Sequence, residues 1–215
     1  MVAEILHGVL YVFPRPALPH ARTASRLGVK LGGPFDLGEG GPGGWHILDE
    51  PELHLGPAEE EDDLVPDLAG WRVERMPKLP RTAHLTLPPD WVCEVLSRRT
   101  EATDRAEKMP IYAREGVRHA WLIHPIRRTL EVFALEADRH WKLLTVHRGA
   151  RRVRAEPFAQ LELDLGLLWP DEEEAPGNDE DEDDPTPPPR EDDPTPPPRS
   201  EAKRAPAKAR KRTRP

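Results

Sequence analysis

The chain has 215 residues, of which 33% are charged, and its formal net charge at pH 7 is −8. This charge is unevenly distributed, because residues 171–199 carry a net −11 and residues 200–215 a net +6. Residues 1–170 keep only a net −3, so the acidic total does not exclude a nucleic-acid partner. No segment approaches the ~20 consecutive apolar residues that a membrane span needs.

The single cysteine and the amino terminus indicate the compartment. Cys93 alone cannot form a disulfide within the chain, which fits a reducing compartment. It lies in an apolar segment where burial raises a thiol pKa, so a small core residue is favoured over a nucleophile. Residues 1–7 lack the cationic start and long apolar run of a secretion signal. We therefore expect a cytoplasmic protein with no membrane partner.

Residues 1–170 are predicted to form one domain in which strands and helices follow in mixed order. A hairpin is expected over 4–13, turning at His7-Gly8, and helically spaced apolar residues predict an amphipathic helix over 20–31. Residues 32–44 contain seven glycines and are expected to form a loop, without the Gly-Lys-Ser/Thr of a P-loop. Extended segments are expected over 45–48 and 52–55 (as strands or a hairpin), 64–71, 91–96, 120–123, 129–135 and 141–146.

A second helix is predicted over 104–115. Asp104 and Glu107 have capping-box spacing, and Gly116 is positioned to end the helix. Pro110 removes one backbone hydrogen bond and is expected to kink the helix just after Lys108. The mixed order of elements favours an α+β fold, a mixed central sheet flanked by helices, over a doubly wound fold.

The carboxyl-terminal part differs in composition and is expected to be disordered. Residues 171–199 are acidic and rich in proline, and the nine residues 182–190 are repeated at 191–199. This repeat has no large apolar side chain to bury, so burial cannot offset the conformational entropy that the segment would lose on folding. Residues 200–215 form a basic tail that could contact phosphate non-specifically, could be masked by the acidic segment, or could be a dispensable solubilising extension.

Two carboxylates lie in apolar extended segments. Glu94 is the only charge in 91–96, and alternation places it on one face with Val92 and Leu96. A bare carboxylate on such a face is costly unless a cation or strong hydrogen bonds compensate it. Taken singly, Glu94 is best explained as a hydrogen-bonded buried carboxylate, Asp67 as a turn residue and Lys108 as a surface lysine.

Together the three residues point to phosphodiester chemistry. Mg²⁺ takes one or two carboxylates, waters and substrate phosphate oxygens as ligands, and Asp67 and Glu94 offer such carboxylates at a sheet edge. The metal activates water, and Lys108 beside it would orient that water and neutralise developing charge. Glu52, in another predicted strand, could supply a third carboxylate.

The same residues carry a family resemblance. It runs through Pro66-Asp67, residues 89–97, Thr100, Asp104, Glu107-Lys108, Tyr112 and residues 116–125. In these features the chain resembles the Uma2 family of restriction endonucleases, once a domain of unknown function and now placed in the PD-(D/E)XK nuclease superfamily. The resemblance extends from Glu4 to about Trp169. It implies a restriction-endonuclease-like core with a Mg²⁺ or Mn²⁺ site at one edge of a mixed sheet.

By this resemblance Asp67 and Glu94 are the motif carboxylates, and Glu52 matches the upstream acidic strand position. The superfamily pattern has a lysine two residues after the glutamate, where this chain has Leu96. The family supplies its lysine from the following helix, which here is Lys108, so the catalytic interpretation depends on Lys108.

Two accessory residues have weaker signals. His20 opens the first predicted helix and either caps or packs that helix or contacts phosphate. Tyr112, one turn after Lys108, shares its helix face and either fixes the lysine rotamer or lines the pocket.

Three hypotheses follow from the sequence. The first is a Mg²⁺-dependent endonuclease acting on DNA, in which cutting both strands at one site would favour a homodimer. The second is a catalytically silent nucleic-acid-binding module on the nuclease fold. The third is an interaction protein whose tail recruits a partner and whose domain is a scaffold. The sequence does not distinguish a DNA from an RNA target.

Overall fold

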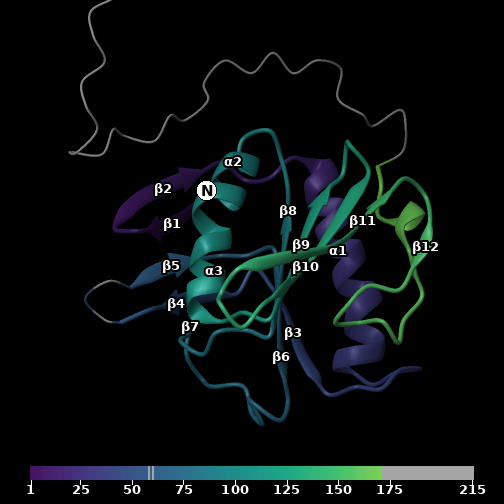
Figure 1. Ribbon diagram of the computed structural model, residues 1–215, viewed down its shortest axis with the longest axis horizontal. Helices are drawn as coiled ribbons and strands as arrows, with labels where there is room; N and C mark the ends of the chain where they lie inside the picture. The colour runs from purple at the N-terminus through teal and green to yellow at the C-terminus, as the bar shows by residue number, and fades with distance from the viewer. Residues whose placement is uncertain (58, 60, 171–215) are drawn as a thin grey trace, which may run out of the picture. The chain divides into compact units, whose positions relative to one another are not determined.

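A computed structural model of the protein describes residues 1–57, 59 and 61–170. The predicted acidic segment 171–199 and basic tail 200–215 lie outside the described residues. Within the described part, the fold is α+β, as predicted, with a mixed central sheet and helices packed on it (Figure 1).

The central sheet has six strands in the order β11-β10-β9-β8-β6-β3. They are β3 (Trp45–Asp49), β6 (Leu68–Arg72), β8 (Trp91–Val95), β9 (His119–His124), β10 (Thr129–Leu135) and β11 (Trp141–Arg148). All neighbours are antiparallel except β8 and β9, which are parallel. Parallel neighbours require a crossover connection, and the helical segment 101–115 provides it.

A smaller sheet has five strands in the order β2-β1-β5-β4-β7. They are β1 (Val2–Leu6), β2 (Val9–Phe13), β4 (Glu52–Leu55), β5 (Asp62–Leu64) and β7 (His84–Leu85). The predicted first hairpin is confirmed, with its turn at His7 and Gly8, whose φ angles are 52° and 77°. A two-residue turn with both φ values positive matches the right-handed twist of the strands it joins.

The segments predicted over 45–55 and 64–71 are divided between the two sheets. Strands β3 and β4 lie in different sheets and are not a hairpin. Likewise β5 belongs to the small sheet and β6 to the central one, so Asp67 lies in the connection between them rather than on a strand. The chain thus crosses from one sheet to the other immediately before Asp67.

The helices differ from the sequence expectation in two places. Helix α1 (Leu18–Leu31) is confirmed, but it continues as the π-helical turn η1 (Gly32–Asp36), so the first part of the expected glycine loop is helical. The crossover begins at α2 (Glu101–Thr103) and continues through the π-helical turn η2 (Asp104–Lys108) into α3 (Met109–Glu115). The remaining short elements are β12 (Arg152–Val153), β13 (Leu163–Asp164) and η3 (Leu165–Leu167).

The middle strands of the central sheet are buried on both faces, and each face has its own core. Helices α1 and α3 lie on opposite sides of β8 and β9 (Figure 1). Trp91 and Cys93 pack with α1 in one core, whereas Val92 and Leu96 pack with α3 and the small sheet in the other. The alternation expected for 91–96 is therefore confirmed, and it directs Glu94 towards α3.

None of the described helices is long and apolar enough to cross a membrane.

The core on the α1 side is centred on an aromatic ring. Phe158 is 1% exposed and has ring contacts with four aromatic side chains, at centroid distances from 4.7 to 5.7 Å. These side chains are Phe35, Trp45, Trp91 and Trp121. The ring, in the segment after β12, thus joins η1 to the central sheet.

Phe158→Ala should lower the free energy of unfolding by about 3–5 kcal/mol, because it removes this ring and leaves a cavity among rigid neighbours. Urea denaturation of both proteins measures the difference. Val29→Ala, at a position that is 76% exposed on α1, should change stability by less than about 0.5 kcal/mol. A Phe158→Ala effect as small as that of Val29→Ala would contradict the role given to the ring.

Candidate active site

Lys108 is buried among three carboxylates. Its Nζ lies 3.0 Å from Glu4 Oε1, 3.3 Å from Glu94 Oε1 and 3.4 Å from Asp104 Oδ1. The lysine and all three acids are at most 5% exposed. The four side chains come from β1, β8 and η2, so three separate elements meet at the ammonium group.

Glu94 is fixed by more than the lysine. The Tyr112 hydroxyl donates a hydrogen bond of 2.6 Å to Glu94 Oε1, and Tyr112 itself is fully buried on α3. Glu94 therefore accepts from two side chains of the crossover, one turn apart. This explains why a carboxylate is tolerated on the apolar face that β8 turns towards α3.

Asp67 lies beside this cluster. Its Oδ2 accepts a 2.7 Å hydrogen bond from the backbone N–H of Val95, the residue after Glu94. Its Oδ1 lies 3.3 Å from His20 Nε2, near the start of α1. Asp67 is thus held by both the central strand and α1, and its side chain is 15% exposed.

The local sequence explains how the crossover brings Lys108 inward. Ser97 Oγ accepts a hydrogen bond from the Thr100 N–H, which satisfies one of the unpaired donors at the start of the helix. The helix then begins at Glu101, so the predicted start at Asp104 and its capping box are wrong. Asp104 lies inside the helix, where four residues separate it from Lys108 on the same face.

The disturbance expected at Pro110 takes the form of a π-helical turn. In η2 the Met109 N–H donates to the Asp104 carbonyl, five residues earlier, and Pro110 follows in the first turn of α3. A proline lacks the N–H and crowds the preceding turn of an α-helix, and π turns of this kind are frequent at functional sites.

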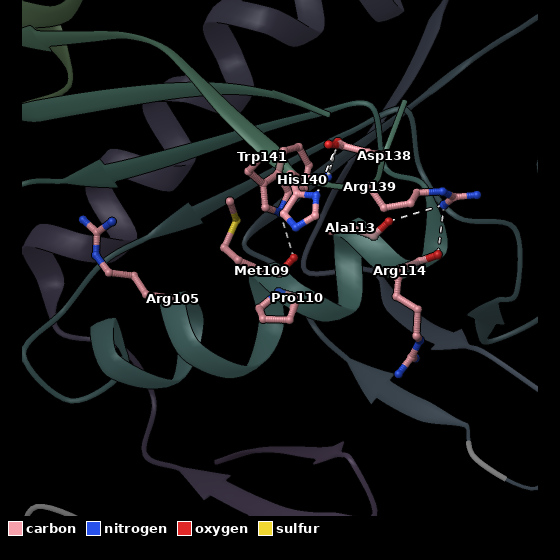
Figure 2. Close-up of a pocket in the computed structure, with 9 residues that line it drawn as sticks. All are labelled: Arg105, Met109, Pro110, Ala113, Arg114, Asp138, Arg139, His140 and Trp141. Carbon is pink, nitrogen blue, oxygen red and sulfur yellow. Dashed lines mark hydrogen bonds and ion pairs between the residues drawn. The ribbon is translucent and has the colours of Figure 1, made fainter. Parts of the chain in front are cut away.

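A hollow between α3 and the β10–β11 hairpin shows how the crossover helix is anchored (Figure 2). The Trp141 indole N–H donates to the Met109 carbonyl at 2.8 Å, and the Arg139 guanidinium donates to the carbonyls of Ala113 and Arg114. A cation on the last carbonyls of a helix satisfies acceptors that would otherwise be unpaired. The β10–β11 hairpin thereby fixes the helix that carries Lys108.

Burial and mutual charge change the proton affinities in this pocket. Burial raises the pKa of Glu94 well above its usual value, although the Lys108 ammonium opposes the shift. Burial alone would lower the pKa of Lys108, but Glu94, Glu4 and Asp104 outweigh it and raise that pKa well above normal. Lys108 is therefore held as an ammonium ion. The pKa of His20 is also raised, because its hydrogen bond to Asp67 and the charge of Asp67 outweigh burial.

The cluster borders a hollow of about 720 Å³ that is lined by charged residues of both signs. Glu4, Asp67, Glu94, Asp104 and Lys108 line it together with His20. Arginines also line it, namely Arg15, Arg98, Arg99 and Arg127. The hollow thus combines buried acids with arginine side chains, of which Arg15 and Arg127 are more than 60% exposed.

Of the five residues proposed to accompany Glu94, three line this pocket, namely Asp67, Lys108 and His20. Tyr112 contacts Glu94 from α3 but does not line the pocket, and Glu52 lies elsewhere. Glu52 lies on β4 of the small sheet, where its Oε1 is 2.9 Å from His54 Nε2. Among the described residues, the groups of three ligating side chains with donor atoms within 4.8 Å of one another both contain His54, and neither includes Asp67 or Glu94. The acidic residue that the first strands bring to Glu94 is instead Glu4.

The chain was compared with protein families, curated proteins and solved structures. The sequence model of the Uma2 family, described as "Putative restriction endonuclease", matches residues 2–166. The chain belongs to the Uma2 family. A crystal structure from Anabaena variabilis ATCC 29413, described as "a putative nuclease belonging to DUF820", is 20% identical with a TM-score of 0.63. The match covers 78% of this chain and 89% of that one, and at this identity it shows a shared fold. No curated protein matches the chain.

Two acids of this Uma2 pocket were missed as site residues by the sequence analysis. Glu4 shares a strand face with the buried Leu6, and a lone carboxylate on such a face is the signal that revealed Glu94. Asp104 stands four residues before Lys108, a spacing that puts both side chains on one helix face. It was taken for a cap because the helix start was placed three residues too late.

The raised pKa of Asp104 gives the pocket a testable pH dependence. Burial raises this pKa from an ordinary 3.8 to about 6, against the lowering effect of Lys108. The folded protein therefore holds the Asp104 proton more tightly than the unfolded chain, and this stabilisation is lost as the pH rises through about 6. Asn at this position has no proton to lose.

The stability of Asp104→Asn relative to the wild type should rise by up to about 3 kcal/mol between about pH 4 and about pH 7. Urea denaturation across this range measures it. Asp138→Asn is the control, because Asp138 is exposed and its pKa is lowered by the N–H of His140, so it should show no such gain. A flat difference for Asp104→Asn would contradict the raised pKa.

Proposed function

We propose that this protein is a Mg²⁺- or Mn²⁺-dependent endonuclease that hydrolyses phosphodiester bonds, with DNA as its substrate. The observation that carries the proposal is the meeting of Asp67, Glu94 and Lys108 in one hollow lined by arginines. Membership of the Uma2 family, described as "Putative restriction endonuclease", and a structural neighbour described as "a putative nuclease" support the same class of reaction.

The residues of the pocket fit a hard divalent cation. Around Lys108, four carboxylates (Glu4, Asp67, Glu94 and Asp104) face one ammonium ion and His20, so acids outnumber cations in this part of the hollow. The arginines and Glu50 line the rest of it. Carboxylate oxygens are the ligands that Mg²⁺ and Mn²⁺ prefer. Asp67 and Glu94 would hold the ion, with Glu4 as a third acid in the part expected of Glu52. A bound ion would activate water and neutralise charge on the phosphate.

The other side chains of the pocket have roles that follow from their contacts. Hydrolysis adds a water oxygen to phosphorus and breaks one P–O bond, so negative charge grows on the phosphate. Because Lys108 is held as an ammonium ion, it can donate hydrogen bonds to that charge or orient the water, but it cannot accept the water's proton. Tyr112 and His20 position Glu94 and Asp67.

The lining of the hollow supports a polyanionic substrate. Arg15, Arg98, Arg99 and Arg127 line it beside the acids, and guanidinium groups bind phosphates with paired hydrogen bonds. Arg15 and Arg127 now pair with Glu50 and Glu101, contacts that a phosphate could replace. A backbone passing these arginines would bring a phosphate to the acids and Lys108.

One observation favours a second candidate, a nucleic-acid-binding module without catalysis. Lys108 already compensates Glu4, Glu94 and Asp104 within 3.4 Å, so these acids are partly neutralised without a metal. If this arrangement persists, the arginines could bind nucleic acid while no cation enters. Calorimetric titration with Mn²⁺ separates the two candidates, because only the endonuclease binds the ion in the pocket.

Supercoiled plasmid should be nicked by the wild-type protein with Mg²⁺ or Mn²⁺ and not with excess EDTA. Asp67→Asn, Glu94→Gln and Lys108→Met should each lower the nicking rate at least about 100-fold, since each removes a group of the reacting site. Glu136→Gln, an exposed acid beyond β10, is the matched control and should nick normally. Circular dichroism must show that the variants remain folded.

The choice between Glu4 and Glu52 is decided by a matched pair of variants. Glu4→Gln should lower nicking and Mn²⁺ affinity as Asp67→Asn does, whereas Glu52→Gln should leave Mn²⁺ binding in this pocket unchanged. The opposite result would return Glu52 to the ligand set. Wild-type protein that binds no Mn²⁺ and nicks neither plasmid nor RNA would favour the silent module.

We also propose that the protein acts as a homodimer, since cutting both strands at one site often needs two active sites.

We propose in addition that the basic tail 200–215 contacts phosphate. Removal of residues 171–215 should then reduce the slope of log affinity for DNA against log salt concentration, by about 0.9 for each lost phosphate contact. Fluorescence anisotropy at several salt concentrations measures the slope. An identical slope would exclude the tail from the interface.

A further inference from the structure

A second group of ligating side chains lies on the small sheet, apart from the proposed active site. Glu52 and His54 are two residues apart on β4, and the intervening Leu53 and following Leu55 are buried in the core. Glu52 and His54 therefore share the outer face of the sheet. His84, on β7, stands in register with Glu52 across the parallel β4–β7 pair.

The donor atoms of these three residues converge. One ligand atom from each of Glu52, His54 and His84 lies within 4.8 Å of the other two. The imidazole rings of His54 and His84 stack at a centroid distance of 3.9 Å with an angle of 11° between their planes. Glu52 Oε1 lies 2.9 Å from His54 Nε2, so this nitrogen faces the group.

The other ring nitrogen of His54 is held by acids on its far side. His54 Nδ1 lies 3.1 Å from Glu61 Oε1 and 3.5 Å from Asp63 Oδ1, and Asp63 is the register partner of His54 on β5. A histidine that ligates a metal almost always donates its second N–H to a carboxylate, which fixes its tautomer and orientation. The cluster thus has an inner donor set and an outer carboxylate, the two parts that such sites combine. Since the two rings stack, one of them would turn so that nitrogens of both face the same ion.

We propose that Glu52, His54 and His84 bind a Zn²⁺ ion on the outer face of the small sheet, with Glu61 positioning His54. Two imidazoles and one carboxylate form a donor set that suits Zn²⁺, whereas Mg²⁺ prefers oxygen ligands alone. Three protein ligands leave a fourth position for water or another ligand. This site is independent of the proposed endonuclease activity, because none of its residues lines the hollow that contains Lys108.

The ion would join strands that otherwise have few contacts. Strand β7 has two residues and pairs only with β4, at the end of the small sheet. Metal bonds from both strands would fasten the segment 73–90, which returns to the central sheet at β8. Zinc should therefore stabilise the folded protein, since a ligand that binds only the folded state raises the free energy of unfolding.

The test uses the full-length protein without a histidine tag, stripped of metal and titrated with ZnCl₂ by calorimetry in millimolar Mg²⁺. One Zn²⁺ per chain should bind, and the thermal midpoint should rise on addition of zinc. His54→Gln and His84→Gln should each weaken binding more than about 100-fold and remove the thermal shift, while Glu61→Gln should weaken binding about 10-fold.

Two matched variants separate this site from other zinc-binding groups. His140→Gln removes an exposed histidine outside the cluster and should bind zinc like the wild type. The double variant His54→Gln/His84→Gln keeps every acidic residue of the chain, so it measures the weak binding that those acids cause. Its thermal midpoint without zinc shows whether it folds.

Three outcomes would overturn the proposal. The first is wild-type binding no tighter than that of the double variant, and the second is unchanged binding in His84→Gln. The third is binding that depends on Glu61 and Asp63 but not on Glu52 and His84, which would assign the ion to the Nδ1 side of His54.

Discussion

The structure depends on the burial of one lysine. An ammonium ion removed from water is tolerated only where carboxylates surround it. For Lys108 they come from the amino-terminal hairpin, the central strand β8 and its own helix. The requirement to satisfy this charge therefore ties the small sheet, the central sheet and the crossover to one point. The same requirement gathers carboxylates at one point, and carboxylate oxygens are the ligand type that hard cations prefer.

Much of the fold and part of the candidate site could be predicted from the sequence. Glu94 was identified because it is the single charge in an apolar strand. Lys108 was identified because Leu96 occupies the position where the superfamily pattern has its lysine, so the lysine had to come from the following helix. Glu52, the acid predicted to accompany Asp67 and Glu94, lies on the small sheet beside His54, and the reason is physical. Glu4 and Glu52 both lie on short strands of alternating pattern, and the pattern does not reveal which strand will lie beside the crossover. Strand pairing between distant segments decides that, and it brings β1 there with Glu4.

The two groups of ligating residues differ in chemistry as well as in place. The pocket around Lys108 offers carboxylate oxygens in a largely buried setting. The cluster around His54 offers imidazole nitrogens on the outer face of a sheet, with a partly exposed acid. Hard and borderline cations prefer different donors. Because Glu52 lies beside His54, it belongs to the second donor set and not to the carboxylates around Lys108.

The parallel pairing of β8 and β9 has an evolutionary consequence. Parallel neighbours need a crossover connection between β8 and β9, and Lys108 lies in the helical part of this crossover. Its distance along the chain from Glu94, 14 residues here, is set by the loop and helix between them and not by the geometry of the strand. Insertions or deletions in that loop could change the spacing while the packing of α3 keeps the ammonium in place. A fixed-spacing motif would therefore overlook such relatives, and two buried opposite charges on a strand and its crossover helix would be the feature to search for.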